Sequence, residues 1–348
     1  MKKINWGIIG LGNIAKKFAE GFFFLDNAIV KGIASTSNYK LNSFKKKFNI
    51  EEKYCFTNYQ KLISCPDIDI IYIALPNSLH AKYINECIRA NKNILVEKPA
   101  FMEFEDFNNF KNLSLNSKCY FTEGFMYRYL PYFKKIKNII EDKTLGDVSN
   151  IISNFNIKVF KEKKIFGIKF RKPNYSKRLF NKSLGGGSIL DLGCYPLSLS
   201  TFINSISYNV SIKNINLKKI NSQYCDSGVD VHSSILLDFD KKFTSHITCS
   251  FKEKMNQNTR INFTNGFILI EDTWVPGKNM QIIIFEKNKE KKIEFVNENI
   301  YSYQIKSISN QLIENKIDPI FPSMNLNEIE MNTFLLSKWI NNLVYEKI

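Results

Sequence analysis

Short apolar runs alternate with helix-like segments over the first third of the chain. The runs predict strands at Ile4–Ile9, Ala28–Ala34, Ile68–Leu75, Asn93–Pro99 and Cys119–Gly124. After the first run, Ile14, Phe18 and Phe22 recur at the spacing of one helix face. Strands that alternate with helices in this way predict a parallel sheet wound on both faces.

A different pattern begins near Gly146, where apolar and polar residues alternate one by one. The alternation runs through Val229–Phe239 and Phe243–Phe251, and the pair Asn265-Gly266 between two further alternating runs is a hairpin signal. This pattern predicts a largely antiparallel sheet with helices on one face. The other face of that sheet is a candidate interface between subunits.

The first predicted strand is followed by a G-x-G-x-x-A motif, Gly10-Leu11-Gly12-Asn13-Ile14-Ala15. Gly10 permits a tight turn, Gly12 lets the backbone approach a pyrophosphate, and Ala15 allows close packing of the next helix. Asn13 and Ile14 are expected beside the phosphates, where the start of the helix offers N–H groups and a positive dipole end. Strand, glycine turn and helix in this order predict a Rossmann dinucleotide site.

The length of 348 residues is too great for one ordinary hydrophobic core. With the change of strand pattern, it predicts an α/β protein of two domains. Residues 1–123 are expected to form a Rossmann dinucleotide-binding domain with a doubly wound parallel sheet. Residues 124–348 are expected to form an α+β domain with a large, mostly antiparallel open sheet, which binds substrate and mediates oligomerisation.

The segment after the second strand bears on the choice between NAD and NADP. A site for NAD usually places Asp or Glu there to bind the ribose 2′-hydroxyl, but no acidic residue lies between Asp26 and Glu51. Hydroxyl and amino groups occur instead at Ser35, Thr36, Ser37 and Lys40. Such groups suit the 2′-phosphate of NADP, at about 1.5–3 kcal/mol for each charge-assisted contact. We therefore expect NADP to be preferred, although hydroxyls that only cap the next helix are compatible with either cofactor.

Two further strands end in polar residues that should face one crevice, because ligands of open α/β sheets bind at the carboxyl ends of the strands. One ends in Glu97-Lys98-Pro99, where proline stops the sheet ladder. The other ends in Leu75-Pro76-Asn77, and His80 follows in the first turn of the next helix. We expect these residues at the cofactor, with His80 as a positioning group rather than a base. Taken alone, Glu97-Lys98-Pro99 could also be an exposed strand exit.

A polar cluster follows three glycines within Leu184–Pro196. The glycines let the backbone turn sharply or pass close to a ligand. If a helix begins near Ser188, Asp191 and Tyr195 lie four residues apart on one face. A carboxylate and a phenol on one face, aimed at Lys98, would form a proton-transfer group. The alternative is an Asp and a Tyr that only pack the helix.

Composition narrows the class of protein. Seven scattered cysteines without a Cys-x-x-Cys pair indicate free thiols, and neither disulfides nor a metal site is expected. The net charge of +16 is typical of nucleic-acid binding, but lysine far exceeds arginine and no basic block with stacking aromatics occurs. No apolar run approaches the roughly 18 residues of a membrane span. We expect a cytoplasmic protein with no nucleic-acid or membrane partner.

The motifs occur in an order that resembles a known family. GLGNIA, LPNSLH, EKP, EGFMYRYLP and GGGSILDLGCYP are together similar to the Gfo/Idh/MocA family of NAD(P)-dependent oxidoreductases. Within it, the similarity is greatest to the branch that contains dihydrodiol dehydrogenase and D-xylose dehydrogenase. The resemblance covers the first 200 residues firmly and the rest by architecture only.

This resemblance implies an acid–base pair, Lys98 and the residue at position 195. Most family members have histidine at the second position, whereas this chain has Tyr195, as the dihydrodiol dehydrogenase branch does. A phenol is a poor base at pH 7 unless a cation such as the Lys98 ammonium stabilises its anion. Tyr195 is thus expected to exchange a proton with the substrate, and Asp191 to fix a neighbouring hydroxyl. Arg128 and Arg178 are candidate substrate contacts.

The sequence therefore predicts an oxidoreductase that uses NADP, or NAD, and acts on a secondary alcohol or ketone of a sugar, cyclitol or diol. A homodimer or homotetramer through the C-terminal sheet is expected. The alternative is a catalytically silent NADP(H)-binding regulatory protein. Loss of Lys98 or of the pair at 191 and 195 would have indicated that alternative, and all three residues are present.

Overall fold

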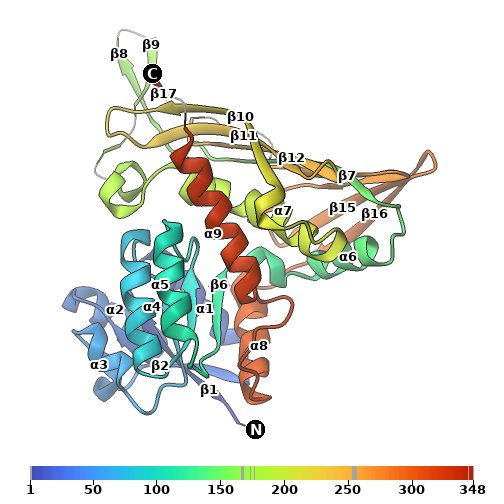
Figure 1. The fold of residues 1–348 in the computed structure, drawn as a ribbon. Coiled ribbons are helices and arrows are strands. Elements are labelled where there is room, and N and C mark those ends of the chain that lie inside the picture. The colour runs from blue at the N-terminus through green and yellow to red at the C-terminus, as the bar shows by residue number, and fades with distance from the viewer. Residues whose placement is uncertain are drawn as a thin grey trace. The chain divides into compact units, whose positions relative to one another are not determined.

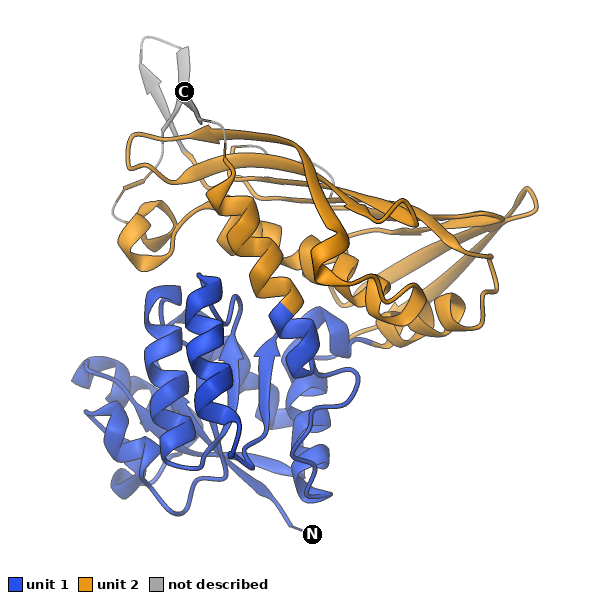
Figure 2. Ribbon diagram, viewed as in Figure 1, with its two compact units in different colours: residues 1–130, 298–330 blue, residues 131–297, 331–348 orange. Residues whose placement is uncertain are grey.

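The structure is a computed structural model that describes residues 2–165, 168–172, 174–175, 177–252, 257–343 and 345–347. Figure 2 shows its two compact units, unit 1 with residues 1–130 and 298–330, and unit 2 with residues 131–297 and 331–348. This division differs from the expected boundary between residues 123 and 124. The change of strand pattern marks the end of one sheet, but it does not reveal that a late segment of the chain returns to unit 1.

Unit 1 contains a parallel sheet with the strand order β3-β2-β1-β4-β5-β6. The strands are β1 (Ile4–Ile9), β2 (Ala28–Ala34), β3 (Cys55–Phe56), β4 (Ile70–Ile73), β5 (Asn93–Glu97) and β6 (Phe121–Gly124). The helices are α1 (Asn13–Glu20), α2 (Asn38–Phe48), α3 (Tyr59–Ile63), α4 (His80–Arg89), α5 (Phe104–Ser114) and α8 (Ile300–Ile313). The strand order is that of a Rossmann sheet, with the switch point between β1 and β4. The expected doubly wound parallel sheet is confirmed.

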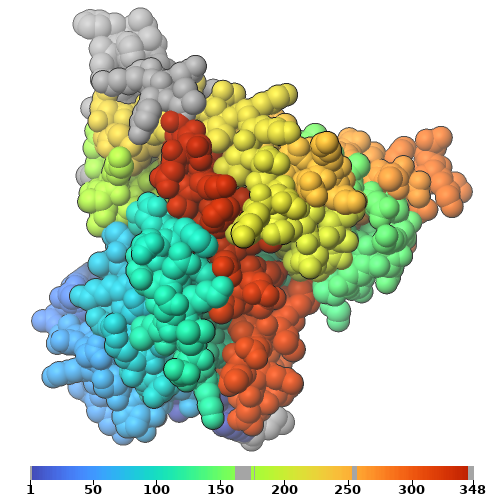
Figure 3. Space-filling view, viewed as in Figure 1, coloured from blue at the N-terminus to red at the C-terminus, as the bar shows by residue number. Residues whose placement is uncertain are grey.

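Helix α8 belongs to unit 1 because it packs on β1 and α1. The indole N–H of Trp6 donates a hydrogen bond to the Ser309 hydroxyl at 3.0 Å, and the ring centres of Phe18 and Tyr301 lie 6.0 Å apart. Figure 3 shows side chains of α4 and α5 in blue-green, and of α8 in orange-red, over the face of unit 1 turned to the viewer. Helices thus enclose the apolar strands of this sheet, which are almost fully buried.

Unit 2 contains a large sheet with the strand order β16-β15-β14-β13-β7-β12-β11-β10-β17. The strands are β7 (Val148–Asn156), β10 (Ile215–Tyr224), β11 (Asp230–Phe239), β12 (Phe243–Ser250), β13 (Thr259–Phe263), β14 (Gly266–Ile270), β15 (Asn279–Glu286), β16 (Lys289–Val296) and β17 (Tyr345–Lys347). Neighbouring strands are antiparallel except in the pairs β7–β12 and β10–β17. A separate hairpin pairs β8 (Lys161–Ile165) with β9 (Ile168–Lys172). The expected mostly antiparallel sheet is confirmed.

Helices cover one face of the unit 2 sheet, where α6 (Pro131–Glu141) and α7 (Cys194–Ser207) lie side by side (Figure 1). The rings of Phe133 on α6 and Phe202 on α7 are 4.8 Å apart. On the face of β7 that points away from these helices, Asn150 and Asn154 are half-buried and Ile152 is 40% exposed. Helix α9 (Leu326–Asn341) begins in unit 1 and ends in unit 2. Within the described ranges, no helix is both long and apolar enough to cross a membrane.

Candidate active site

The loop after β1 forms the first part of the candidate cofactor site in unit 1. Gly10 has a φ of +87°, and a Cβ there would lie 2.5 Å from the carbonyl oxygen of Ala74, so only glycine fits. Gly12 precedes α1, and a Cβ there would meet no described atom within 4 Å. The first turn of α1, with Asn13 and Ile14, carries no acidic side chain. The open space before Gly12 therefore suits a phosphate group at the positive end of the helix.

The loop between β2 and α2 shows how the residues expected at the 2′-phosphate are used. The Ser35 hydroxyl accepts a hydrogen bond from the N–H of Ser37 at 3.2 Å, and the Ser37 hydroxyl accepts one from the N–H of Lys40 at 3.4 Å. Ser37 is therefore the N-cap of α2. Both hydroxyls keep a proton to donate, and Thr36 and Lys40 are exposed. The loop can cap its helix and still receive an anion.

His80 lies in the interior of unit 1, between the loops that follow β4 and β5. Its Nδ1 atom is 2.8 Å from the carbonyl oxygen of Pro99, and its Nε2 atom is 2.9 Å from that of Leu75. The side chain is completely buried. Leu75 in turn packs against Gly10, Asn77 is buried, and Pro76 is half-buried between them. This geometry agrees with a positioning function for His80, because a base must reach its substrate.

Glu97 and Lys98 stand at the carboxyl end of β5, and both side chains are half-buried. The Tyr72 hydroxyl, from β4, donates a hydrogen bond to Glu97 Oε1. Lys98 is followed by a cis peptide bond to Pro99. Strand β5 therefore places Lys98 at the edge of the sheet where a Rossmann domain binds its ligand.

Glu123 is a buried carboxylate beside this edge that the sequence analysis did not single out. Its Oε1 atom accepts a hydrogen bond from the N–H of Ala100 at 2.9 Å. Burial raises the pKa of Glu123 to about 7, although the Ala100 hydrogen bond and the positive charges of Arg128 and Lys98 act against this rise. The available signal was an acidic residue inside an otherwise buried strand, β6, since such residues are rarely buried without a function.

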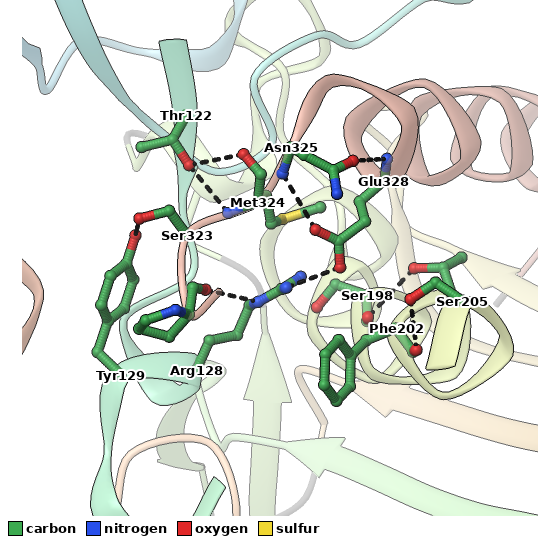
Figure 4. A network of polar contacts seen from close by, with 12 residues as sticks. Thr122, Arg128, Tyr129, Ser198, Phe202, Ser205, Ser323, Met324, Asn325 and Glu328 are labelled. Carbon is green, nitrogen blue, oxygen red and sulfur yellow. Dashed lines mark hydrogen bonds and ion pairs between the residues drawn. The ribbon is translucent and has the colours of Figure 1, made fainter. Parts of the chain in front are cut away.

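Arg128 occupies a structural position in unit 1 (Figure 4). Its Nη2 atom forms an ion pair with Glu328 at 2.7 Å, and its Nε atom donates to the carbonyl oxygen of Pro322 at 3.1 Å. Arg128 is 1% exposed and Glu328 is 8% exposed. The N–H of Asn325 donates to the second carboxylate oxygen of Glu328. Contact of Arg128 with substrate stays a prediction, but the buried pair gives the residue a structural function of its own.

In unit 2, the glycine turn before α7 is held by Asp230, at the start of β11. The Asp230 carboxylate accepts hydrogen bonds from the Ser188 hydroxyl at 2.6 Å and from the N–H of Ile189 at 2.8 Å. Gly187 has a φ of +119°, and a Cβ there would lie 2.2 Å from Asp230 Oδ1. Burial raises the pKa of Asp230, and the hydrogen bonds from Ser188 and Ile189 oppose the rise. The pattern of β11 gave no sign that its first residue caps a distant helix.

Two of the expected site residues of unit 2 come together here. Arg178 Nη2 forms an ion pair with Asp191 Oδ1 at 2.9 Å. Asp191 belongs to a π-helical segment, Ile189–Gly193, which leads into α7. The expected helix near Ser188 is therefore present, but its first turn is wider than an α-helical turn, a feature that is frequent at functional sites.

Tyr195 lies one turn after Asp191, in the first turn of α7. Its ring meets Phe155 edge-on, with ring centres 5.2 Å apart, and is tilted against Trp274 at 6.0 Å. The side chain is 6% exposed, so its orientation is fixed by packing. Lys98 belongs to unit 1, whereas Asp191 and Tyr195 belong to unit 2. The residues of the expected proton-transfer group thus come from both units.

Comparison with protein families identifies the class of protein. Residues 4–125 match the family model described as "Oxidoreductase family, NAD-binding Rossmann fold", and residues 133–269 match the "GFO/IDH/MocA C-terminal domain". The fold, the glycine turn and these matches define an NAD(P)-dependent oxidoreductase. More specifically, the chain belongs to the Gfo/Idh/MocA family, as its motifs had indicated.

Curated relatives have the names that the motifs led us to expect. Trans-1,2-dihydrobenzene-1,2-diol dehydrogenase of Xenopus tropicalis is 25% identical, with 97% of each chain covered. D-xylose 1-dehydrogenase (NADP(+)) 2 of Haloferax volcanii is 24% identical, with 75% of this chain and 74% of the relative covered.

A solved structure has the same fold over its whole length. It is a 3-ketoreductase from Actinomadura kijaniata in complex with NADP and TDP-benzene, with 18% identity, complete coverage of both chains and a TM-score of 0.82. At this identity the likeness concerns the fold.

Proposed function

We propose that the protein transfers hydride between NADP(H) and a secondary alcohol or ketone of a sugar, cyclitol or diol, with Lys98 and Tyr195 as the proton-transfer pair. The observation that carries the proposal is the placement of Asp191 in the π-helical segment that leads into α7 and of Tyr195 one turn later, in the first turn of α7. The names of the relatives, which refer to diols and xylose, support this substrate class.

The bound nicotinamide supplies the hydride acceptor or donor. Tyr195 holds the proton at its phenolic oxygen and exchanges it with the substrate oxygen. Lys98 stabilises the phenolate through its positive charge and holds the substrate oxygen. Asp191, fixed by its ion pair with Arg178, accepts a hydrogen bond from a neighbouring hydroxyl of the substrate. Glu97, held by Tyr72, orients Lys98 or the nicotinamide ribose.

The first experiment is a titration with NADPH and with NADH, followed by the quench of intrinsic fluorescence. We expect tight binding of NADPH, weaker binding of NADH, and loss of both in Gly12→Arg, because the new side chain fills the phosphate space. The thermal stability of Gly12→Arg should stay near that of the wild type, since no described atom lies within 4 Å of its Cβ. A folded wild-type protein that binds neither nucleotide would refute the proposal.

Turnover separates the enzyme from a silent NADP(H)-binding protein. The purified protein with NADP⁺ should oxidise at least one member of a panel of pentoses, hexoses, cyclitols and vicinal diols, measured as NADPH absorbance. If NADPH binds tightly but no compound of the panel is oxidised or reduced, the result supports the alternative of a catalytically silent regulatory protein.

The preference for NADP rests on Lys40 and the three hydroxyls before it. Lys40→Glu should weaken NADPH binding by roughly 10- to 100-fold, because an attractive charge becomes a repulsive one at the 2′-phosphate. NADH binding should stay within about threefold. Lys46→Glu is the matched control, because it makes the same charge change in an exposed position later in α2. Equal effects of the two variants on NADPH would show that only net charge matters.

One face of the unit 2 sheet is covered by no helix that the structure describes, and it supports a further part of the proposal, a homodimer or homotetramer formed through this sheet. Its partly exposed apolar side chains, such as Ile152, would be buried by a second copy. Sedimentation equilibrium measures the molecular mass directly. A monomer at micromolar concentration would contradict this assembly.

A further inference from the structure

One peptide group of unit 1 is held from both ends by buried side chains. It joins Pro99 to Ala100, one residue after Lys98. Its carbonyl oxygen lies 2.8 Å from His80 Nδ1, and its N–H donates to Glu123 Oε1 at 2.9 Å. The peptide group lies beyond the end of β5, where the sheet ladder no longer supplies partners. His80 and Glu123 thus supply the polar partners that neighbouring strands supply within the sheet.

The ring of His80 lies between the loops that follow β4 and β5. Both of its ring nitrogens face carbonyl oxygens, those of Pro99 and Leu75, at 2.8 and 2.9 Å. A carbonyl oxygen can only accept a hydrogen bond, and a neutral imidazole has only one N–H to donate. The imidazole ring therefore spans the carbonyl oxygens of Leu75 and Pro99, and its tautomer decides which of them receives the hydrogen bond.

Glu123 holds the other end of the peptide group, through the N–H of Ala100. When Glu123 is ionised, this hydrogen bond is charge-assisted. The charged groups around Glu123 are Glu97 and Lys98 from the end of β5 and Arg128 from the turn after β6. Its second oxygen, Oε2, is buried without a hydrogen-bond partner in the described part of the chain. Glu123 therefore uses Oε1, and not Oε2, to accept the hydrogen bond from Ala100.

We propose that His80 and Glu123 are positioning residues, which fix Lys98 by holding the peptide group between Pro99 and Ala100 from opposite ends. The inference rests on the proposed function of Lys98. Neither side chain touches the reacting atoms; both act by restricting the backbone to which Lys98 is attached. Small displacements of a catalytic group are costly, since about 1 Å can lower the rate 10²-fold.

The test compares Glu123→Met, which loses the acceptor oxygen, with Glu123→Gln, which keeps one. We expect kcat to fall roughly 10- to 100-fold in Glu123→Met and by much less in Glu123→Gln, with the affinity for NADPH unchanged in both. His80→Gln, which loses the ring that spans the two carbonyl oxygens, should resemble Glu123→Met. Glu330→Met is the matched control, since Glu330 pairs with Lys111 away from this peptide group, and its kcat should stay at the wild-type value.

A double-variant cycle with Lys98→Met separates positioning from a general loss of structure. If Glu123 acts through Lys98, adding Glu123→Met to Lys98→Met should lower the residual kcat no further. Equal effects of Glu123→Met in both backgrounds would overturn the inference. So would wild-type kcat in Glu123→Met or His80→Gln. A Lys98→Met enzyme with full activity would instead refute the proposed function, so the two failures are distinguishable.

The pH profile gives a second readout. Because the pKa of Glu123 lies at about 7 and the neutral acid still accepts from the Ala100 N–H, kcat should rise only slightly as the pH increases through this value, by no more than the factor lost in Glu123→Gln. Glu123→Gln should lose this inflection while other inflections remain. An unchanged profile in Glu123→Gln would contradict the charge-assisted hold.

Discussion

Tyr195→Phe and Lys98→Met are each expected to lower kcat by about 10² to 10⁴. The Tyr195 ring packs edge-on against Phe155 and is tilted against Trp274, and phenylalanine keeps both contacts. The substitution removes only the hydroxyl, so the loss would report proton transfer. Lys98→Met keeps most of the length of the side chain and removes its charge. Steady-state turnover of the best sugar or diol found in the panel measures both effects.

The control for this prediction is Tyr208→Phe, at the other end of α7. The Tyr208 hydroxyl donates to the carbonyl oxygen of Val148 at 2.6 Å, so its loss costs some stability but should leave kcat unchanged. The affinity for NADPH should be the same in Tyr195→Phe and Tyr208→Phe as in the wild type. If Tyr195→Phe keeps more than a tenth of the wild-type kcat, the phenol is not the group that exchanges the proton.

The second large effect concerns stability. Arg128→Met is expected to lower the free energy of unfolding by about 3–5 kcal/mol, because Glu328 would remain as a buried charge without its partner. Urea denaturation followed by circular dichroism measures this loss. Since Glu328 also accepts a hydrogen bond from the N–H of Asn325, a neutral acceptor at this position should limit the damage.

The double variant Arg128→Met with Glu328→Gln should therefore recover part of the stability that Arg128→Met loses. A double variant less stable than Arg128→Met alone would contradict the account of an uncompensated charge. The same proteins also test Arg128 as a substrate contact. A raised KM in the folded Arg128→Met enzyme would support that contact, whereas an unchanged KM would assign the residue to the fold alone.

Local patterns predicted those elements whose signals lie within a few residues. The bounds of β1 and β2 equal those of their apolar runs, and Asn265-Gly266 does mark a hairpin. Even there, Gly266 pairs with Phe263, so the loop itself is Thr264 and Asn265. The strand order depends on distant contacts, and no pattern within β7 indicates that it lies between β13 and β12.

The candidate site shows the same limit. Residues carried by a motif, such as Gly10 and Gly12, could be named because each glycine has a geometric reason that the local sequence reveals. Asp230 could not, because its function depends on a turn made by Gly187 in another part of the chain. Glu123 is an intermediate case, since a buried acidic residue is unusual but its partner, Ala100, comes from a neighbouring loop.

Helix α8 belongs to unit 1 but follows most of unit 2 in the sequence, so it is synthesised late. Residues 1–130 emerge from the ribosome long before Ile300–Ile313 is synthesised. During that time Trp6 lacks its partner Ser309, and Phe18 lacks its partner Tyr301. The nascent N-terminal segment therefore exposes apolar surface throughout the synthesis of unit 2. Completion of the nucleotide-binding unit therefore follows the synthesis of α8, and a shortened chain that ends at residue 130 should aggregate.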